Sequence, residues 1–135
     1  MSPATVARTR ILLHAPDAKV KAWIERELAG RYHVLAARSA REIVTVLIDD
    51  PPPRPQVLVV DFDALSSADV LGLSSVRDRG WFGAIIALGS VSNDLARSMN
   101  INVVLARPLE SELLREAVES VGVEGATIRI PTVKK

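Results

Sequence analysis

The chain predicts an α/β fold: a three-layer sandwich in which helices cover both faces of a five-stranded parallel sheet. Three observations support this prediction. Short apolar runs alternate with amphipathic segments along the 135 residues. Residues 57–60 (Val-Leu-Val-Val) are apolar at every position and rich in β-branching, which is typical of a strand buried on both faces. Helical segments separate successive strands, and this order implies parallel pairing with right-handed crossovers.

Residues 10–14 (Arg-Ile-Leu-Leu-His) form the first expected strand. Asp17 follows at a position suited to capping a helix, because its carboxylate can accept a hydrogen bond from a free N–H of the first turn. This helix carries apolar residues at the spacing of one helical face, namely Val20, Trp23, Ile24 and Leu28. Gly30 is expected to end it, since glycine readily adopts the conformation that follows a helix C-terminus.

The second helix is expected between the strands at residues 32–36 and 57–60. Ser39 and Glu42 have the Ser-x-x-Glu spacing of a capping box, which opens a helix that continues to residue 48. The four prolines within residues 51–55 end this helix, because proline cannot continue it and favours extended geometry in the residue before it.

The second half of the chain repeats the same order of elements. A helix is expected at residues 69–79, a strand at 84–88, a weaker helix at 94–99, a strand at 103–105 and a last helix at 110–121. Five strand–helix repeats in one small domain indicate a flavodoxin-like three-layer sandwich.

We expect one domain over residues 1–122 and a C-terminal tail over residues 123–135. In an extended tail, Ile128 and Ile130 would face the same way, because strand side chains alternate. This pattern predicts a short extra strand that docks on the sheet edge, beside the last helix or on a second copy of the chain. A tail that is not pinned to anything is the alternative.

Composition excludes several classes of function. Seventeen basic and sixteen acidic residues give a net charge of +1, which offers no electrostatic case for nucleic acid or an anionic membrane. The chain has no cysteine, so thiolate metal sites and cysteine nucleophiles are excluded. No apolar run approaches the roughly 18 residues that a membrane span needs. We therefore expect a cytoplasmic protein.

Three segments carry a resemblance to a known family. Residues 55–61 (Pro-Gln-Val-Leu-Val-Val-Asp) resemble the third strand of the receiver domain of two-component response regulators, which ends in a phospho-accepting aspartate. Residues 84–88 are similar to its fourth strand, and residues 104–109 (Val-Leu-Ala-Arg-Pro-Leu) to its fifth strand and Lys-Pro-Phe ending. The resemblance covers residues 10–121. It implies a phosphorelay-type signalling module whose partner is a protein such as a histidine kinase.

The acidic positions of this family are only partly retained. The resemblance makes Asp61 the phospho-acceptor position, but Ala15 and Pro16 stand where the family has the acidic pair that helps bind magnesium. The remaining candidate metal ligands are Asp17, Asp61 and Asp63. We expect Asp17 to cap its helix instead and Asp63 to be a solvated loop acid. The sequence therefore predicts a degenerate receiver, or pseudo-receiver, without a resident metal.

Other positions of the phosphate site also depart from the family. Gly89, followed by Ser90, stands at the family's threonine or serine position, Arg107 at its lysine, and Val104 at its aromatic switch residue. Arg107 could hold a phosphate through its guanidinium fork. We favour an ion pair between Arg107 and Asp61 that closes the site without phosphate, and an Arg107 that points to solvent is the alternative.

The weaker helix, the fifth strand and the last helix would form the face that receivers use for dimerisation and output. Its expected interaction residues are Asp94, Arg97, Val104, Glu112, Arg115, Glu116 and Glu119. These charges could pair across a two-fold axis in a homodimer. A solvated polar face explains them equally well.

The favoured function is a single-domain, receiver-like signalling module that acts by protein–protein contact, with phosphorylation lost or impaired. It would be neither an enzyme nor the carrier of a cofactor. One alternative is a working response regulator that is phosphorylated on Asp61, in which case magnesium would be its cofactor. A flavodoxin-like small-ligand binder or enzyme is the alternative from another class, although no glycine-rich phosphate loop follows any strand.

Overall fold

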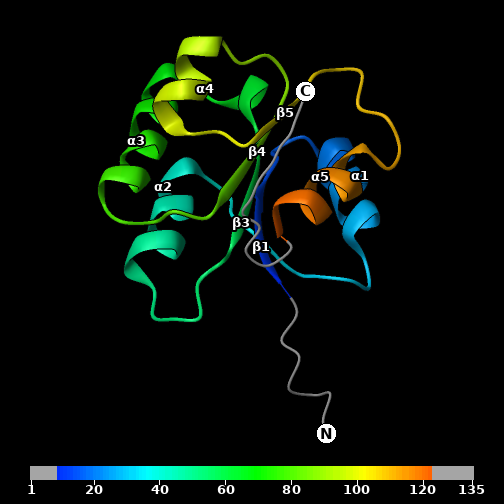
Figure 1. Ribbon diagram of the computed structural model, residues 1–135, viewed down its shortest axis with the longest axis horizontal. Coiled ribbons are helices and arrows are strands. Elements are labelled where there is room, and N and C mark those ends of the chain that lie inside the picture. Colours follow the sequence, from blue (N-terminus) through cyan, green and yellow to red (C-terminus); the bar gives the residue numbers. More distant parts are fainter. Residues whose placement is uncertain (1–8, 123–135) are drawn as a thin grey trace, which may run out of the picture.

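A computed structural model describes residues 9–122, and these residues form a parallel sheet with helices on both faces (Figure 1). The strand order is β2-β1-β3-β4-β5, so the chain has the expected flavodoxin-like fold. The strands are β1 Arg10–His14, β2 His33–Ala36, β3 Val57–Asp61, β4 Ala84–Leu88 and β5 Val103–Leu105. The helices are α1 Ala18–Leu28, α2 Ala40–Val44, η2 Thr45–Asp49, η3 Phe62–Ala64, α3 Ser67–Asp78, α4 Asn93–Met99 and α5 Leu113–Gly122.

Two apolar cores lie on opposite faces of the sheet. Helices α2, α3 and α4 cover one face, and α1 and α5 cover the other (Figure 1). Alternate side chains of the central strand enter different cores: Leu58 and Val60 face the α2–α3–α4 side, whereas Val57 and Val59 face the α1–α5 side. This explains why residues 57–60 are apolar at every position. Both edges of the sheet are strands with more exposed residues, β2 and β5.

The predicted helix caps at the start of the chain are present. Asp17 accepts a hydrogen bond from the backbone N–H of Lys19, 2.7 Å away, and Ser39 caps α2 through the N–H of Glu42. Gly30, just after α1, has a φ of +79°.

Two predicted helix starts are wrong by two or three residues. Helix α3 begins at Ser67 because Ser66 and Asp69 form a capping box that we did not anticipate. Helix α5 begins at Leu113 and not at residue 110, since Glu112 has a φ of +72° and its N–H bonds to Glu27 on α1. Strand β2 begins one residue later than expected, at His33.

The aromatic pair after α3 divides into a buried and an exposed residue. Trp81 is 7% exposed and donates a hydrogen bond to the carbonyl of Pro55, whereas Phe82 is 78% exposed. The Arg77 guanidinium lies 5.3 Å from the Trp81 ring and donates hydrogen bonds to carbonyls at the C-terminus of α4 and before β4. Arg77 thereby ties α3 to both elements.

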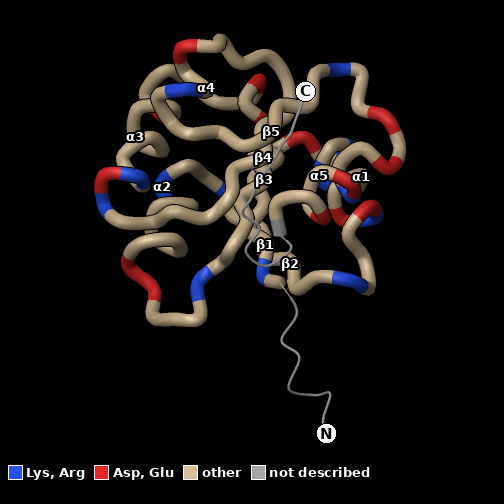
Figure 2. Tube along the Cα trace, in the orientation of Figure 1, with Lys and Arg blue, Asp and Glu red and all other residues tan. Residues whose placement is uncertain are grey.

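The predictions for the C-terminal tail, including the extra strand with Ile128 and Ile130, fall outside the described residues. Within residues 9–122, no helix has the length and apolarity that crossing a membrane requires. Basic and acidic residues alternate around the molecule in Figure 2, in keeping with the small net charge of +1.

Candidate functional site at the carboxyl edge of the sheet

The carboxyl ends of three neighbouring strands bring together four residues that are far apart in sequence. Asp61 is the last residue of β3, Asp63 lies in η3, Ser90 follows β4 and Arg107 follows β5. Parallel strands end at the same edge of the sheet, so these loops converge. We call Asp61, Asp63 and Arg107 the carboxylate–arginine cluster.

Arg107 bridges the two carboxylates. Its Nη2 lies 2.9 Å from Asp61 Oδ2, and its Nε lies 2.9 Å from Asp63 Oδ2. The predicted ion pair between Asp61 and Arg107 is therefore present. The Asp61 side chain is only 4% exposed, whereas that of Arg107 is 40% exposed. The cation thus covers a buried carboxylate from the solvent side.

Asp63 is held on three sides and is not the solvated loop acid that we considered. Its Oδ1 accepts a hydrogen bond from the backbone N–H of Ser90 at 3.0 Å, and its Oδ2 is bound by Arg107. Its own N–H donates to Asp61 Oδ1 at 3.1 Å. Each oxygen of both carboxylates therefore accepts at least one hydrogen bond.

Gly89 provides the space for this arrangement. Its φ is +102°, and a Cβ added there would clash with the side-chain carboxylate of Asp63. Any larger residue would therefore collide with the Asp63 carboxylate as well as adopt an unfavourable backbone conformation. Gly89 is thus matched to the carboxylate that lies against it.

Hydrogen bonding sets the protonation of the cluster. The N–H of Ser90 and the Arg107 guanidinium favour the ionised form of Asp63 and lower the pKa of its carboxyl below the ordinary 3.8. In return, the hydrogen bond to Asp63 and the charges of both carboxylates raise the pKa of Arg107. At neutral pH the ionised Asp63 carboxylate is therefore paired with the Arg107 cation.

These residues do not fit the magnesium site of a receiver. Magnesium needs a nearly octahedral set of oxygen ligands, usually including one or two carboxylates. Both available carboxylates are already bound by Arg107, and Ala15 and Pro16 have no side-chain oxygen. The third candidate, Asp17, is an exposed helix cap. Among the described residues no cluster of three His, Cys, Asp or Glu side chains is placed to hold a metal.

The expected interaction residues are exposed or half-buried, and most of the charged ones pair within the chain. Arg97 pairs with Asp94 at 3.8 Å, and Arg115 pairs with Glu112 at 3.4 Å. Glu119 pairs at 3.0 Å with Arg31, which follows α1. Glu119 therefore lies on the α1 side of α5. Glu116 is exposed, and Val104, on edge strand β5, is 40% exposed.

The sequence contained one signal for the role of Asp63 that we did not use. An aspartate two residues after the end of β3 and a glycine directly after β4 occupy adjacent loops at one edge of a parallel sheet. A glycine can permit the close approach of another group. The two residues together predict that a side chain from the β3 loop packs against the β4 loop.

No protein-family model matches this chain, and no curated protein matches it. Solved structures do resemble it. The chemotaxis protein CheY4 of Vibrio cholerae has a TM-score of 0.70 and 20% identity, over 85% of this chain and 99% of that chain. The non-phosphorylated HemR receiver domain of Leptospira biflexa has a TM-score of 0.70 and 16% identity, over 90% of this chain and all of that chain (100%).

A protein from Burkholderia thailandensis named for pilus assembly (cpaE) has a TM-score of 0.66 and 25% identity, over 84% of this chain and 97% of that chain. TM-scores of 0.66–0.70 over nearly the full length of these domains establish the common architecture. The described part of the chain thus has the CheY-like, flavodoxin-like fold of receiver domains.

Proposed function

We propose that this chain is a receiver-like signalling module that acts through protein contacts and is not switched by phosphorylation of Asp61. The observation that carries the proposal is the double ion pair of Arg107 with Asp61 and Asp63. The receiver-type structures that share its fold support a role in signalling. The same fold occurs in a protein named for pilus assembly, so fold alone does not fix the pathway.

The cluster opposes phosphoryl transfer in two ways. Transfer to a carboxylate depends on positioning and on neutralising charge on the phosphoryl oxygens. Here the Arg107 cation is already bound by two carboxylates. In addition, the Asp61 side chain is buried, and neither of its oxygens is free. Oδ2 accepts a hydrogen bond from Arg107, and Oδ1 accepts one from the Asp63 N–H. An incoming phosphodonor would have to displace Arg107 without help from carboxylates at positions 15 and 16.

In this proposal the Asp63 carboxylate occupies the hydrogen-bond donors that could otherwise bind an external anion at this edge. Its carboxylate binds the guanidinium of Arg107 and the N–H of Ser90. The site is therefore permanently filled by a side chain of the chain itself. The module has no enzymatic activity and no cofactor of its own, and its partner is another protein, for example a histidine kinase or a second copy of this chain.

The test is incubation of the purified chain with magnesium and acetyl phosphate, followed by intact-mass measurement. We expect no stable gain of one phosphoryl group, while an active receiver treated in parallel gains one. A gain that disappears in Asp61→Asn would overturn the proposal and establish a working response regulator. Light scattering with and without acetyl phosphate should give the same molar mass.

A further inference from the structure

The edge strand β2 has backbone groups that face away from the sheet. Within residues 9–122 its one neighbouring strand is β1. The backbone N–H groups of His33 and Ala37 donate to carbonyls of β1 and of the residue before it, so these alternate residues are directed toward β1. Successive residues of a strand direct their backbone groups to opposite sides. Val34 and Ala36 therefore present their N–H and C=O groups outward.

The outer side of β2 is also accessible. His33, Leu35 and Ala36 are exposed, and Leu35 is a large apolar side chain with 36% of its surface exposed. Natural edge strands are commonly protected from pairing with another chain by lysine, proline or a bulge. Strand β2 contains no charged residue and no proline, and it pairs in regular register with β1. Its outer side is thus open to a further strand.

The chain around β2 is basic. Residues 29–41 contain three arginines and no acidic residue. Arg31, before the strand, is engaged by Glu119 on α5. Arg38 and Arg41 lie close together after the strand, because they line the same hollow beside α2. Positive charge is therefore concentrated at the carboxyl end of β2.

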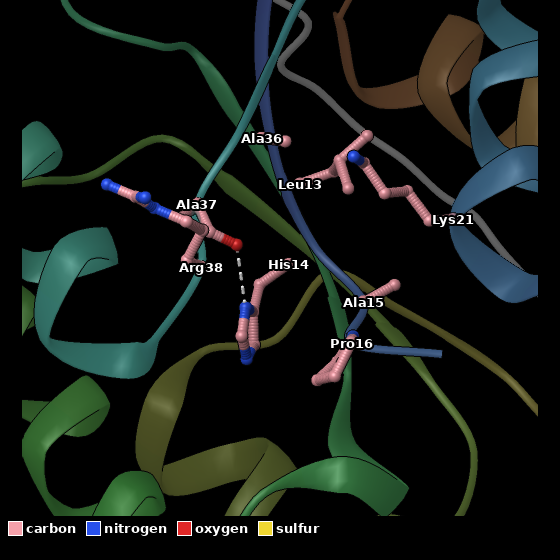
Figure 3. Close-up of a pocket in the computed structure, with 8 residues that line it drawn as sticks. All are labelled: Leu13, His14, Ala15, Pro16, Lys21, Ala36, Ala37 and Arg38. Carbon is pink, nitrogen blue, oxygen red and sulfur yellow. Dashed lines mark hydrogen bonds between the residues drawn. The ribbon is translucent and has the colours of Figure 1, made fainter. Parts of the chain in front are cut away.

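These two arginines are largely available. Arg41 is exposed and has no ion pair with the rest of residues 9–122. The Arg38 side chain is 92% exposed, extends away from β1 in Figure 3, and lies 3.7 Å from Glu42, which also accepts the Arg38 backbone N–H. The neighbouring cavity of about 330 Å³ in Figure 3 has no acidic residue in its described lining. Acidic groups of a partner would therefore be favoured here.

We propose that β2 binds an extended acidic segment of a partner protein, which adds to the sheet as a further strand. The backbone of the segment bonds to Val34 and Ala36, one of its apolar side chains packs on Leu35, and its carboxylates pair with Arg38 and Arg41. In this binding mode backbone hydrogen bonds provide affinity and alternate side chains provide specificity. The proposal names the kind of partner for the proposed function, and it rests on that function only in requiring action through protein contacts.

A second copy of the chain fits this edge less well. Antiparallel pairing of two β2 strands would bring Arg38 of one copy toward Arg31 of the other, because basic residues flank the strand at both ends. Like charges that face each other across paired strands are destabilising. An acidic segment complements both ends of the strand.

The experiment is an NMR titration of the isotope-labelled full chain with three blocked peptides of about six residues, the length of a typical strand. The first alternates glutamate and valine, the second alternates lysine and valine, and the third is the first with every backbone amide N-methylated. With the glutamate peptide we expect saturable shifts and slowed hydrogen exchange at the amides of Val34 and Ala36. The lysine peptide should bind more weakly, and the N-methylated peptide should not bind.

Two variants test the two kinds of contact. Arg41→Met should weaken binding of the glutamate peptide roughly two- to fivefold, the effect of one exposed ion pair. Arg97→Met is the matched control, because it removes the same charge from α4. Ala36→Pro removes an outward N–H and no bond to β1, and it should weaken binding about tenfold or more. Its urea midpoint establishes that the variant is folded.

The proposal is overturned if the shifts do not saturate, if they occur at β5 instead, if the lysine peptide binds as well, or if both variants bind like the wild type. Slow exchange of the Val34 and Ala36 amides without peptide would overturn it too: the edge is then occupied by the chain itself or, where the exchange depends on protein concentration, by a second copy. Phosphorylation of Asp61 would overturn the proposed function without changing the peptide result, so the two failures are distinguishable.

Discussion

The carboxyl edge of the sheet contains two charged regions with opposite organisation. Over β3 to β5, Arg107 lies within 2.9 Å of each of two carboxylates, and the cation is fully engaged. Over β1 and β2, Lys21 has no ion-pair partner within residues 9–122, and one imidazole nitrogen of His14 has no hydrogen bond among the same residues. The first region stabilises the protein through contacts already made. The polar groups of the second region make fewer such contacts.

This contrast predicts that the two halves of one edge contribute differently to stability. An engaged cluster contributes to stability and is hard to open, because separating its charges leaves a buried carboxylate unpaired. An unengaged cation contributes little to stability and can pair with an incoming anion at low cost. Substitutions of Arg107 and Lys21 should therefore change the free energy of unfolding by very different amounts. They are the first and the last of the following predictions.

The largest effect is expected for Arg107→Met. This change leaves the Asp61 carboxylate, which is 4% exposed, without its cation. Breaking a fully buried pair costs about 3–5 kcal/mol, and since Arg107 is 40% exposed we expect about 2–4 kcal/mol in urea denaturation at neutral pH. Arg97→Met removes an exposed pair and should change the free energy of unfolding by less than about 0.5 kcal/mol. Equal urea midpoints for Arg107→Met and the wild type would show that the cluster is not stabilising.

A smaller effect is expected from filling the space beside Asp63. Gly89 and Gly80 have φ values of +102° and +101°, but a Cβ on Gly80 would meet nothing within 4 Å. Both substitutions introduce the same backbone strain, but only Gly89→Ala also introduces a steric clash. Gly89→Ala should therefore be less stable than Gly80→Ala by about 1–2 kcal/mol, the cost of overpacking. In an Asp63→Gly background this difference should shrink. If it persists there, Asp63 is not what requires glycine at this position.

The pH dependence of stability tests the ionised state of Asp63. The pKa of this carboxyl is lowered in the folded protein, so its contribution is present above the ordinary value of 3.8 and is lost as the pH falls below it. Asp63→Asn should reduce stability at pH 7 by about 0.5–1 kcal/mol, the scale of a partly exposed ion pair. The difference from the wild type should diminish as the pH is lowered past 3.8. The measurement is the urea midpoint of both proteins from neutral pH downward. If Asp63 is not paired, the difference between Asp63→Asn and the wild type will stay constant as the pH falls.

The smallest effect is expected for Lys21→Met. Because Lys21 has no ion pair to lose, the free energy of unfolding should stay within about 0.5 kcal/mol of the wild type, or rise slightly. The measurement is the same urea denaturation as for Arg107→Met. A loss comparable to that of Arg107→Met would mean that Lys21 has a structural partner, and the two regions would not differ as described.

Local sequence patterns determined most of the fold. The continuous apolar run of β3, the caps Asp17 and Ser39 and the alternation of strands with helices depend on residues a few positions apart, and they predicted the sheet and the order of its elements. The pairing of Asp61 with Arg107 was also predicted, because the resemblance to receiver domains places both residues at the same edge of the sheet. The start of α5 could not be predicted in this way, since it depends on a hydrogen bond between Glu112 and Glu27 on another helix.

Only the tertiary structure decided how the side chains at that edge are engaged. Asp63 is bound by groups 27 and 44 residues away, and His14 is oriented by a carbonyl 23 residues away. From sequence alone, Asp63 could be a solvated acid or a metal ligand, and His14 a packed or a surface residue. The sequence specifies which residues reach the edge, because strand periodicity is local. Which of them pair and which remain free depends on distances between loops, and those are set only when the sheet assembles.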